Sequence, residues 1–319
     1  MPKQFVPMIG GHSLFDLTLE RMAAIPGAAA PIVVTGAAHL PLVTGAVADI
    51  SGARVLVEPI GRNTAPAAIA AAMVAGEGEV LLIVPSDHLI SDTSGFAEAV
   101  GRAVACAEEG GIVTFGITPS RPETGYGYIE IGEPGRHGSF AVERFKEKPP
   151  SEEAETMATD GRHLWNSGMF LALAGQLLAE AASYHGDLVE GVRASLSGDQ
   201  GDVIDLGPAF SEVESISIDY AIMEKTAEAL VVPLDVGWDD VGSYLSLLQA
   251  LPRDAKGNHV DGEVLLRDVT GSLVIATSRR VAVVGLSDHV VVETADAVVV
   301  LPLSRSQEVR ELAKRAEPG

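Results

Sequence analysis

The stretch "LLIVPSDHLI", residues 81–90, decides how the first half of the chain is interpreted. Its apolar run, residues 81–84, predicts a strand that is buried on both faces, and Pro85 ends that strand. Asp87 and His88 then follow at the carboxyl end of the strand, which is where open α/β sheets place their ligands. The stretch therefore predicts an α/β fold with a carboxylate at its ligand-binding edge.

Strand-like and helix-like segments alternate on both sides of this stretch. The predicted strands are residues 30–36, 53–59, 81–84 and 112–117, and the predicted helices are "RNTAPAAIAAAMVAG" (62–76) and "SGFAEAVGRAVACAEEGG" (94–111). Asn63 or Thr64 is expected to cap the first helix, and Ser94 is expected to begin the second. This alternation predicts a mainly parallel sheet with helices on its faces.

The pattern changes after residue 118 and again near Pro252. Two predicted hairpin strands, a polar helix and two further strands occupy "GYGYIEIG" (125–132), "SFAVERFKEKP" (139–149), residues 151–160, "LWNSGMFLAL" (164–173) and "ALVVPLDVGW" (229–238). Beyond Pro252 the runs are short and β-like until "SQEVRELAKRA" (306–316), which predicts a closing helix. We therefore expect an α/β domain over residues 1–252 and a small β-helix-like domain over residues 253–319.

Composition limits the classes of function. The chain has 319 residues, of which 47% are hydrophobic and 21% charged, as is typical of a globular enzyme. A single cysteine, Cys106, excludes an intramolecular disulfide, and its place on a predicted helix face indicates a buried thiol.

No secretory leader and no membrane-spanning run is visible, so the expected location is the cytoplasm. A net charge of −22 disfavours nucleic acid and anionic membranes as partners, so a phosphate ligand needs local cations or a metal ion.

Asp87 has two interpretations. It is either a turn or helix cap, or a ligand for a hard divalent cation beside a phosphate. "GWDDVGSY" (237–244) supplies further acids, since Asp239 and Asp240 follow a predicted strand in a tight turn. A double aspartate is often a solvated turn, but two aspartates at different strand ends can share one Mg²⁺ with the phosphates of a nucleotide.

Four other motifs each have both a structural and a functional interpretation. "VERFKEKP" (142–149) is either a solvated hairpin face or a cationic phosphate site, and "RNTAP" (62–66) is either a capped helix start or a set of free N–H groups for an anion or a base edge. Gly125 and Gly127 permit a turn or a close approach of a ligand. Asn166 lies in an apolar strand, where its amide requires either a structural partner or a sugar hydroxyl.

The order of the motifs is more specific than any one of them. "EPIGRNTAPAAIAAA", "VPSDHLI", "FGITPSRPETGYGYIEIG", "VERFKEKP", "WNSGMFL", "SIDYAIMEK", "VPLDVGWDDVGSY", "GNHVDGEVLLRD" and "DHVVVETADAVVV" occur in this order along nearly the whole chain. In this the chain closely resembles the mannose-1-phosphate guanylyltransferases. The resemblance implies a Rossmann-like nucleotidyltransferase domain followed by a small β-helix domain. It also implies conversion of GTP and mannose 1-phosphate to GDP-mannose and diphosphate with Mg²⁺, and a possible homodimer formed through the β domain.

The resemblance also assigns roles to residues. The implied metal ligands are Asp87 and Asp240, and the implied catalytic residues are Lys3, Asp87, Lys148 and Asp240. The implied nucleotide-binding residues are Arg62, Asn63, Thr64, Pro85 and Asp87, and the sugar-phosphate-binding residues are Gly127, Glu147, Lys148 and Asn166. Asp239 is left out because its position varies in the family. His88 is expected to be a hydrogen-bonding neighbour of Asp87, since a sugar phosphate is already an anionic nucleophile and needs no general base.

One family motif is not found in the 319 residues. In the family a glycine-rich loop, G-G-x-G-T-R-L-W-P-L-S-R, precedes P-K-Q, and here Pro2, Lys3 and Gln4 follow Met1 directly. That loop would carry the first strand and donors for the triphosphate, so we hypothesise that Met1 is an internal methionine and that neighbouring strands have unpaired edges. Two alternatives stand beside the guanylyltransferase: a catalytically silent nucleotide-sugar-binding subunit, and a nucleotidyltransferase for another sugar 1-phosphate.

Overall fold

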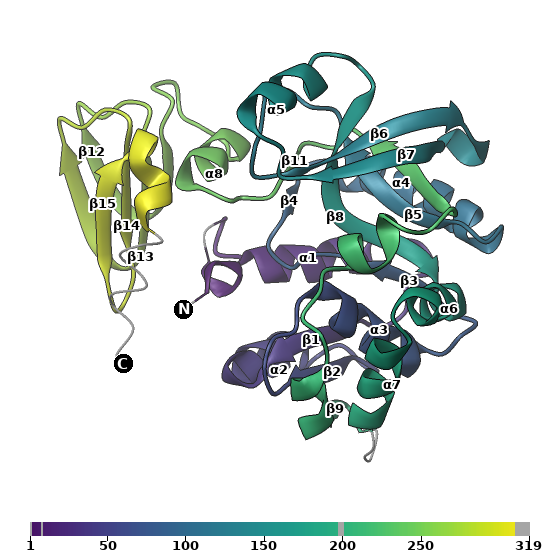
Figure 1. Cartoon of the computed structure of the whole chain (residues 1–319). Helices are drawn as coiled ribbons and strands as arrows, with labels where there is room; N and C mark the ends of the chain where they lie inside the picture. Colours follow the sequence, from purple (N-terminus) through teal and green to yellow (C-terminus); the bar gives the residue numbers. More distant parts are fainter. Residues whose placement is uncertain (1, 8, 197–200, 310–319) are drawn as a thin grey trace. The chain divides into compact units, whose positions relative to one another are not determined.

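A computed structural model describes residues 2–7, 9–196 and 201–309 of the chain (Figure 1). The chain forms two compact units, each of which is described by itself. The smaller unit comprises residues 1–20, 86–92 and 237–319, and the larger unit comprises residues 21–85 and 93–236. The smaller unit thus draws on three separate stretches of sequence. The predicted domain boundary at residues 252/253 stays a prediction.

The larger unit contains two sheets. The first is a parallel sheet of three strands, β1 (Ile32–Gly36), β2 (Arg54–Glu58) and β9 (Val203–Asp205). The second has six strands in the order β3 (Val80–Ile83), β8 (His163–Leu173), β5 (Ile112–Ile117), β10 (Ala229–Leu234), β7 (Phe140–Glu147) and β6 (Gly127–Pro134). Strand β8 runs antiparallel to both β3 and β5, while β10 runs parallel to β5. The mixed α/β fold confirms the predicted class. The three-stranded sheet is parallel throughout, but β5 and β10 are the only parallel pair among the described strands of the six-stranded sheet, because β8 and the hairpin strands β6 and β7 join it antiparallel.

Strand β3 differs from the prediction in its burial. All four of its residues are half-buried, so the prediction that this run is buried on both faces is wrong. The physical reason is its place in the sheet. In the described part of the chain β3 pairs only with β8, and β1 pairs only with β2, so each leaves one edge without a partner strand. An edge strand is less enclosed than a central one.

Helices cover the sheets of the larger unit. They are α2 (Leu40–Val47), α3 (Thr64–Ala75), α4 (Thr93–Glu108), α5 (Ser151–Met157), α6 (Ala174–Tyr184) and α7 (Gly186–Ser195). Asn63 caps α3 as predicted, and α3 is rich in alanine because it is enclosed on nearly all sides by α6, α7 and the sheets. Helix α4 begins at Thr93, one residue before the predicted start. Its Cys106 is 2% exposed, which confirms a buried thiol.

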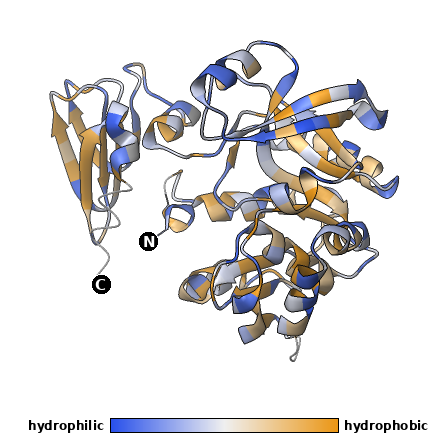
Figure 2. Cartoon of the chain, in the orientation of Figure 1, coloured by the Kyte–Doolittle hydropathy of each residue, from blue (hydrophilic) through white to orange (hydrophobic). Residues whose placement is uncertain are grey.

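The smaller unit is built mainly from short strands. Strand β4 (Leu89–Ile90) pairs with β11 (Trp238–Asp239), and α8 (Tyr244–Ala250) follows with Ser243 and Ser246 forming a capping box. Beyond them lie β12 (His259–Arg267), β13 (Leu273–Val284), β14 (His289–Glu293) and β15 (Val298–Pro302), of which the first three pair in parallel and β15 pairs antiparallel to β14. Successive parallel strands of this kind confirm the predicted β-rich C-terminal domain. Figure 2 shows hydrophobic residues along them.

Three further elements lie near the two ends of the described chain. A single 3-10 turn, Lys3–Phe5, and helix α1 (Leu14–Ala23) begin the chain, and a 3-10 segment, Leu303–Glu308, follows β15. The predicted closing helix over residues 306–316 lies mostly outside the described residues. None of the helices described is long and apolar enough to cross a membrane.

A buried carboxylate joins the end of β14 to the middle of β13. Glu293 is 3% exposed, and it accepts hydrogen bonds from the main-chain N–H groups of Ser278 and Arg279 and from both of their side chains. The hydrogen bonds from Ser278, followed by those from Arg279, lower the pKa of Glu293 to about 2. Carboxylates held by several donors in this way favour the ionised form.

We predict that Glu293→Gln lowers the free energy of unfolding in a pH-dependent way. The unfolded carboxyl titrates at about 4.3, so the stabilisation by Glu293 is fully present above about pH 5 and is lost as the pH falls toward 2. Urea unfolding of both proteins between pH 7 and pH 2 should show a difference that disappears at the acid end. Glu263→Gln is the control, because Glu263 forms an exposed ion pair with Arg280. A difference independent of pH would contradict the prediction.

Candidate active site

Lys3 brings together the two predicted metal ligands in the smaller unit. Its ammonium lies 3.1 Å from Oδ2 of Asp87 and donates to the main-chain carbonyl oxygens of Asp240, at 2.9 Å, and Val241, at 3.0 Å. These residues are far apart in the sequence, and the pairing of β4 with β11 joins the segments that carry the aspartates. One cation therefore contacts the carboxylate of Asp87 and the backbone of Asp240.

His88 has a different partner from the one predicted. Its Nδ1 accepts a hydrogen bond from Nε1 of Trp238 at 3.2 Å, whereas its Nε2 lies 3.9 Å from Oδ1 of Asp87. A separation of 3.9 Å is too long for a hydrogen bond, so these two side-chain atoms do not form the predicted bond. Because an indole N–H can only donate, Nδ1 must be the unprotonated nitrogen and Nε2 carries the proton of the neutral ring. His88 thus packs on Trp238 and presents an N–H toward Asp87.

The two adjacent aspartates shape the turn after β11. Oδ1 of Asp239 accepts from the main-chain N–H of Val241 at 2.7 Å, and Oδ1 of Asp240 accepts from that of Gly242 at 3.0 Å. Between them Val241 has φ = 49°, which is a strained conformation for a β-branched residue. Asp239 therefore has a structural role in the turn, and its Oδ1 is occupied by that role.

The oxygen donors of this cluster fit a magnesium ion. Mg²⁺ is commonly held by one or two carboxylates together with water and substrate phosphate. Asp87 is 34% exposed, and the Lys3 ammonium already marks a position where a cation is stabilised by oxygen atoms from both segments. In the described part of the chain no group of three or more His, Cys, Asp or Glu side chains forms a closed metal site. The residues therefore suit a metal ion that is shared with a substrate.

The start of helix α3 in the larger unit is occupied by the protein itself. Thr64 N–H donates to the side chain of Asn63, Ala65 N–H donates to the carbonyl oxygen of Ile216 at 3.1 Å, and Pro66 has no N–H. The expectation that this helix end offers free N–H groups to an anion is therefore not met at these positions. Asn63 is held at φ = 69°, a sparsely populated conformation.

Two buried polar atoms lie just before α3, one at the end of β2 and one in the loop that follows it. Oε1 of Glu58 and Nε of Arg62 have no hydrogen-bond partner among the described residues. Burial raises the pKa of the Glu58 carboxyl, although a hydrogen bond from the Arg62 main-chain N–H acts in the opposite direction. Unsatisfied buried groups are uncommon in native proteins, so this loop has unused capacity for hydrogen bonds with a ligand.

The hairpin of β6 and β7 places Gly127 opposite Glu147. A Cβ atom at Gly127 would lie only 2.5 Å from Oε2 of Glu147 and 3.4 Å from Cβ of Asn166, so a larger residue fits there only if the Glu147 carboxylate moves. Lys148 donates to Oε1 of Glu147 at 2.8 Å, and this interaction raises the pKa of Lys148. Lys148 also has a positive φ of 45°. The three predicted residues Gly127, Glu147 and Asn166 are thus neighbours in space.

Asn166 has a partner that the sequence did not reveal. Its Nδ2 donates to Oδ1 of Asp219 at 2.6 Å, and its Oδ1 accepts from the main-chain N–H of Gly168 at 3.1 Å. Burial, together with the nearby charge of Glu147, raises the pKa of Asp219 despite the hydrogen bond from Asn166. Pro85 lies close to this group, 3.7 Å from where a Cβ of Gly168 would be. The only sequence signal for Asp219 was its place in "SIDYAIMEK".

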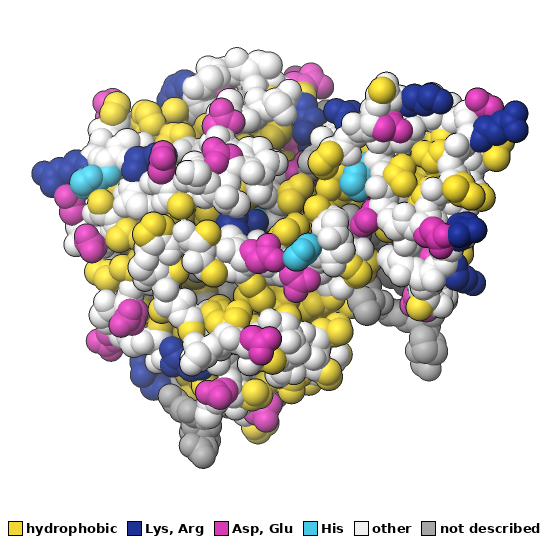
Figure 3. All heavy atoms as spheres, turned by 180° about the vertical axis from the view of Figure 1, so that it is seen from behind, with side chains coloured by type: hydrophobic (Ala, Val, Ile, Leu, Met, Phe, Trp, Pro, Cys, Tyr) yellow, Lys and Arg dark blue, Asp and Glu magenta, His cyan; other side chains and the backbone are white. Residues whose placement is uncertain are grey.

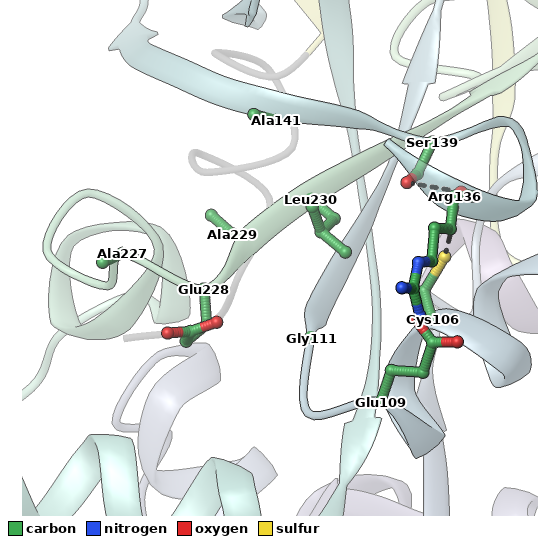
Figure 4. A pocket seen from close by; sticks show the side chains of 10 residues that line it. All are labelled: Cys106, Glu109, Gly111, Arg136, Ser139, Ala141, Ala227, Glu228, Ala229 and Leu230. Carbon is green, nitrogen blue, oxygen red and sulfur yellow. Dashed lines mark hydrogen bonds and ion pairs between the residues drawn. The ribbon is translucent and has the colours of Figure 1, made fainter. Parts of the chain in front are cut away.

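A shallow pocket of about 180 Å³ lies at the other end of the same sheet (Figure 4). It is lined by residues at the amino ends of β5 and β10, whereas Asn166 pairs with Gly116 near the carboxyl end of β5. Two of its charged lining residues are paired with each other, since Glu109 contacts Arg136 at 3.2 Å, and Glu109 also contacts His137 at 3.3 Å. This pocket is separate from the predicted site.

The chain is similar to proteins of known family along nearly its whole length. Residues 1–257 match the family described as nucleotidyl transferase, and residues 262–315 match the MannoseP isomerase/GMP-like beta-helix domain. A mannose-1-phosphate guanylyltransferase of Escherichia coli is 37% identical over 97% of this chain and 68% of its own length. The chain belongs to the mannose-1-phosphate guanylyltransferase family.

Other relatives agree with this membership of the guanylyltransferase family. The xanthan biosynthesis protein XanB of Xanthomonas campestris pv. campestris is 44% identical over 98% of this chain and 68% of its own length. A crystal structure described as mannose-1-phosphate geranyltransferase from Thermus thermophilus is 33% identical, with a TM-score of 0.86 over 99% of this chain and 93% of that one. The nucleotidyltransferase family and its β-helix domain are thereby confirmed.

We predict that Asp219→Asn increases the free energy of unfolding relative to the native chain as the pH rises. A buried acid with a raised pKa is unfavourable when it is ionised, so the native protein loses stability from about pH 4 up to the raised value. The variant keeps an oxygen acceptor for Asn166 and has no charge to bury. Urea unfolding at several pH values tests this, with Asp205→Asn, which removes an exposed charge of the same unit, as control. A gain that is equal at pH 4 and pH 8 would refute it.

Proposed function

We propose that the chain is a mannose-1-phosphate guanylyltransferase, which converts GTP and mannose 1-phosphate to GDP-mannose and diphosphate. A phosphate oxygen of the sugar phosphate attacks the α-phosphate of GTP, and diphosphate leaves in line. The nucleophile is already an anion, so the protein has to position the reactants and neutralise charge. The observation that carries the proposal is the Lys3 ammonium, which contacts both the Asp87 carboxylate and the backbone of Asp240.

In the smaller unit Asp87 and Asp240 would hold Mg²⁺. When bound, the ion would stabilise negative charge that develops on the transferring phosphoryl group. Lys3 supplies a second positive charge beside them. Local cations matter in this chain because its net charge is −22. On the face drawn in Figure 3, lysine and arginine side chains are scattered among acidic ones without a continuous basic field.

In the larger unit the Gly127, Glu147 and Asn166 group would bind the mannose and Lys148 would bind its phosphate. Oε2 of Glu147 and Nδ2 of Asn166 both lie near the position that a Cβ of Gly127 would take, at 2.5 and 3.7 Å, so one polar group of a ligand could reach both. Arg62, Asn63 and Thr64 would face the nucleotide. Support for this comes from the unpaired polar atoms of Arg62 and Glu58 and from the strained φ of Asn63.

Two alternative functions predict different results when ligand binding and diphosphate release are measured. A silent nucleotide-sugar-binding subunit would bind GDP-mannose without releasing diphosphate, and an enzyme for another sugar would prefer a different sugar 1-phosphate. A panel of nucleoside triphosphates and sugar phosphates distinguishes these, measured on this chain and on a chain extended upstream through the family's glycine-rich loop. A homodimer formed through the β domain stays a prediction.

We predict that Asp87→Asn and Asp240→Asn each lower diphosphate release by roughly 10²–10³-fold, because each removes one charged ligand from the proposed metal ion. The asparagine that replaces Asp240 keeps an oxygen that can accept from Gly242, so the turn is expected to stay intact. A coupled diphosphate assay at a series of Mg²⁺ concentrations provides the measurement. Asp235→Asn is the matched control, since Asp235 is an exposed acid that lies close to Asp240 in the sequence. Native rates in both variants would eliminate the proposed metal site.

We predict that Gly127→Ala weakens the binding of mannose 1-phosphate by about tenfold or more. The added methyl group would lie 2.5 Å from Oε2 of Glu147, so the carboxylate must move away from its position beside Asn166. Gly125→Ala is the control, because a Cβ there meets only Oε1 of Glu123 at 3.3 Å. Titration calorimetry with mannose 1-phosphate compares the two variants. Equal affinity in both would show that Gly127 does not lie against the bound sugar.

A further inference from the structure

We propose that Asp219 is a positioning residue that fixes the side-chain amide of Asn166. With the amide fixed, the site recognises one sugar hydroxyl, which accepts a hydrogen bond from Asn166 and donates one to Glu147. The proposal rests on the proposed function, since it concerns how the same site recognises its sugar phosphate. Four observations carry it: the bonds of Asn166, the place of Glu147, the way Asp219 is held, and the cost of burying its charge.

The bonds of Asn166 determine what it can offer a ligand. Its Oδ1 accepts from Gly168 N–H at 3.1 Å and also lies 3.3 Å from the hydroxyl of Thr114. One hydrogen of its Nδ2 goes to Asp219 at 2.6 Å. An amide group has two N–H donors and one carbonyl acceptor. Asn166 therefore retains a single N–H for a substrate, and it acts toward that substrate as a donor.

Glu147 supplies the complementary acceptor. Its Oε1 is occupied by the Lys148 ammonium, whereas its Oε2 lies 2.5 Å from where a Cβ of Gly127 would be, a position that is also 3.7 Å from Nδ2 of Asn166. An ionised carboxylate can only accept. A group that binds to both residues must accept from Asn166 and donate to Glu147, which is the property of a hydroxyl. An ether oxygen, a carbonyl or a fluorine cannot do both.

The segment just before Asp219 is bonded to the first turn of helix α3. Ala65 N–H donates to the carbonyl oxygen of Ile216, and the hydroxyl of Thr64 accepts from Ile218 N–H at 2.9 Å. Asp219 then begins a π-helical turn, Asp219–Met223. The carboxylate that orients the sugar-facing amide is therefore fixed to the helix end that carries the nucleotide-facing residues.

The charge of Asp219 has no obvious structural benefit. Burial and the neighbouring Glu147 raise its pKa, and Asp219 and Glu147 in turn raise the pKa of Glu224 after burial. Lys148 is the nearby cation, but its ammonium is paired with Glu147. A carboxylate buried among other acids is unfavourable for folding, whereas it is the strongest available acceptor for the Asn166 N–H. Its presence is explained by orientation of the amide.

The first test compares Asp219→Ala with Asp219→Asn by titration calorimetry. We expect alanine to weaken mannose 1-phosphate binding by about 10–100-fold, the range found when a residue that orients a metal ligand is lost. Asparagine keeps an acceptor oxygen and should restore most of the affinity, and GTP affinity should be unchanged in both variants. A purely structural role would instead lower both affinities together, and that result would overturn the proposal.

The second test uses the native chain and does not depend on a variant that folds. Monodeoxy and monofluoro analogues of mannose 1-phosphate are titrated at each hydroxyl position. At one position both analogues should bind at least about tenfold more weakly, because fluorine cannot donate to Glu147. If fluorine preserves affinity at every position, the proposal is wrong.

The proposed function and the proposed role of Asp219 can be disproved separately. Absence of mannose 1-phosphate binding by the native chain would remove the proposed function itself. Binding by the native chain together with unchanged affinity in Asp219→Ala would leave that function standing and remove only the role of Asp219.

Discussion

The Lys3 ammonium is the contact that links three segments of the smaller unit at the candidate site. It joins the first residues of the chain to the segments around residues 87 and 240, which no local pairing in the sequence brings together. A chain with net charge −22 has few cations to place, and this one contacts three oxygen atoms at once. The same arrangement that stabilises the fold around a positive charge is the one that a triphosphate and its counter-ion require. Structural and functional demands therefore coincide at a single side chain.

The larger unit holds polar side chains in fixed orientations and leaves one hydrogen-bonding group of each available to a ligand. Asn166 is constrained on both sides of its amide, by Gly168 and Asp219, and still keeps one N–H. Glu147 is held by Lys148 through one oxygen and keeps the other beside Gly127. Pre-orientation of this kind lowers the entropic cost of binding, because the side chains are already ordered before a ligand arrives.

The sequence predicted what is local and missed what is distant. The cap at Asn63, the strand before Pro85 and the rungs of the C-terminal domain follow from neighbouring residues, and the structure contains them. The half-burial of β3 depends on which strands lie beside it, and the occupied helix start depends on Ile216, which is distant in the sequence. Asp219 was missed for the same reason, since its partner Asn166 is 53 residues distant. Local sequence patterns carry no information about contacts between residues that are distant in the sequence. The roles of the predicted site residues stay predictions.

The backbone is strained at three residues in or next to the candidate sites, and this strain connects the fold with the proposed chemistry. Asn63, Lys148 and Val241 all have positive φ, although glycine would adopt it without strain. Each such residue costs on the order of 1–3 kcal/mol, and each is held by specific bonds. Val241 is fixed by Asp239 and Lys3, Asn63 by its own side chain on Thr64 N–H, and Lys148 by its N–H to the carbonyl of Tyr126. Glycine at these points would relieve strain but would remove the Asn63 and Lys148 side chains and loosen the turn that follows Asp240. Retaining strained residues therefore maintains the orientation of the groups that the proposed reaction needs.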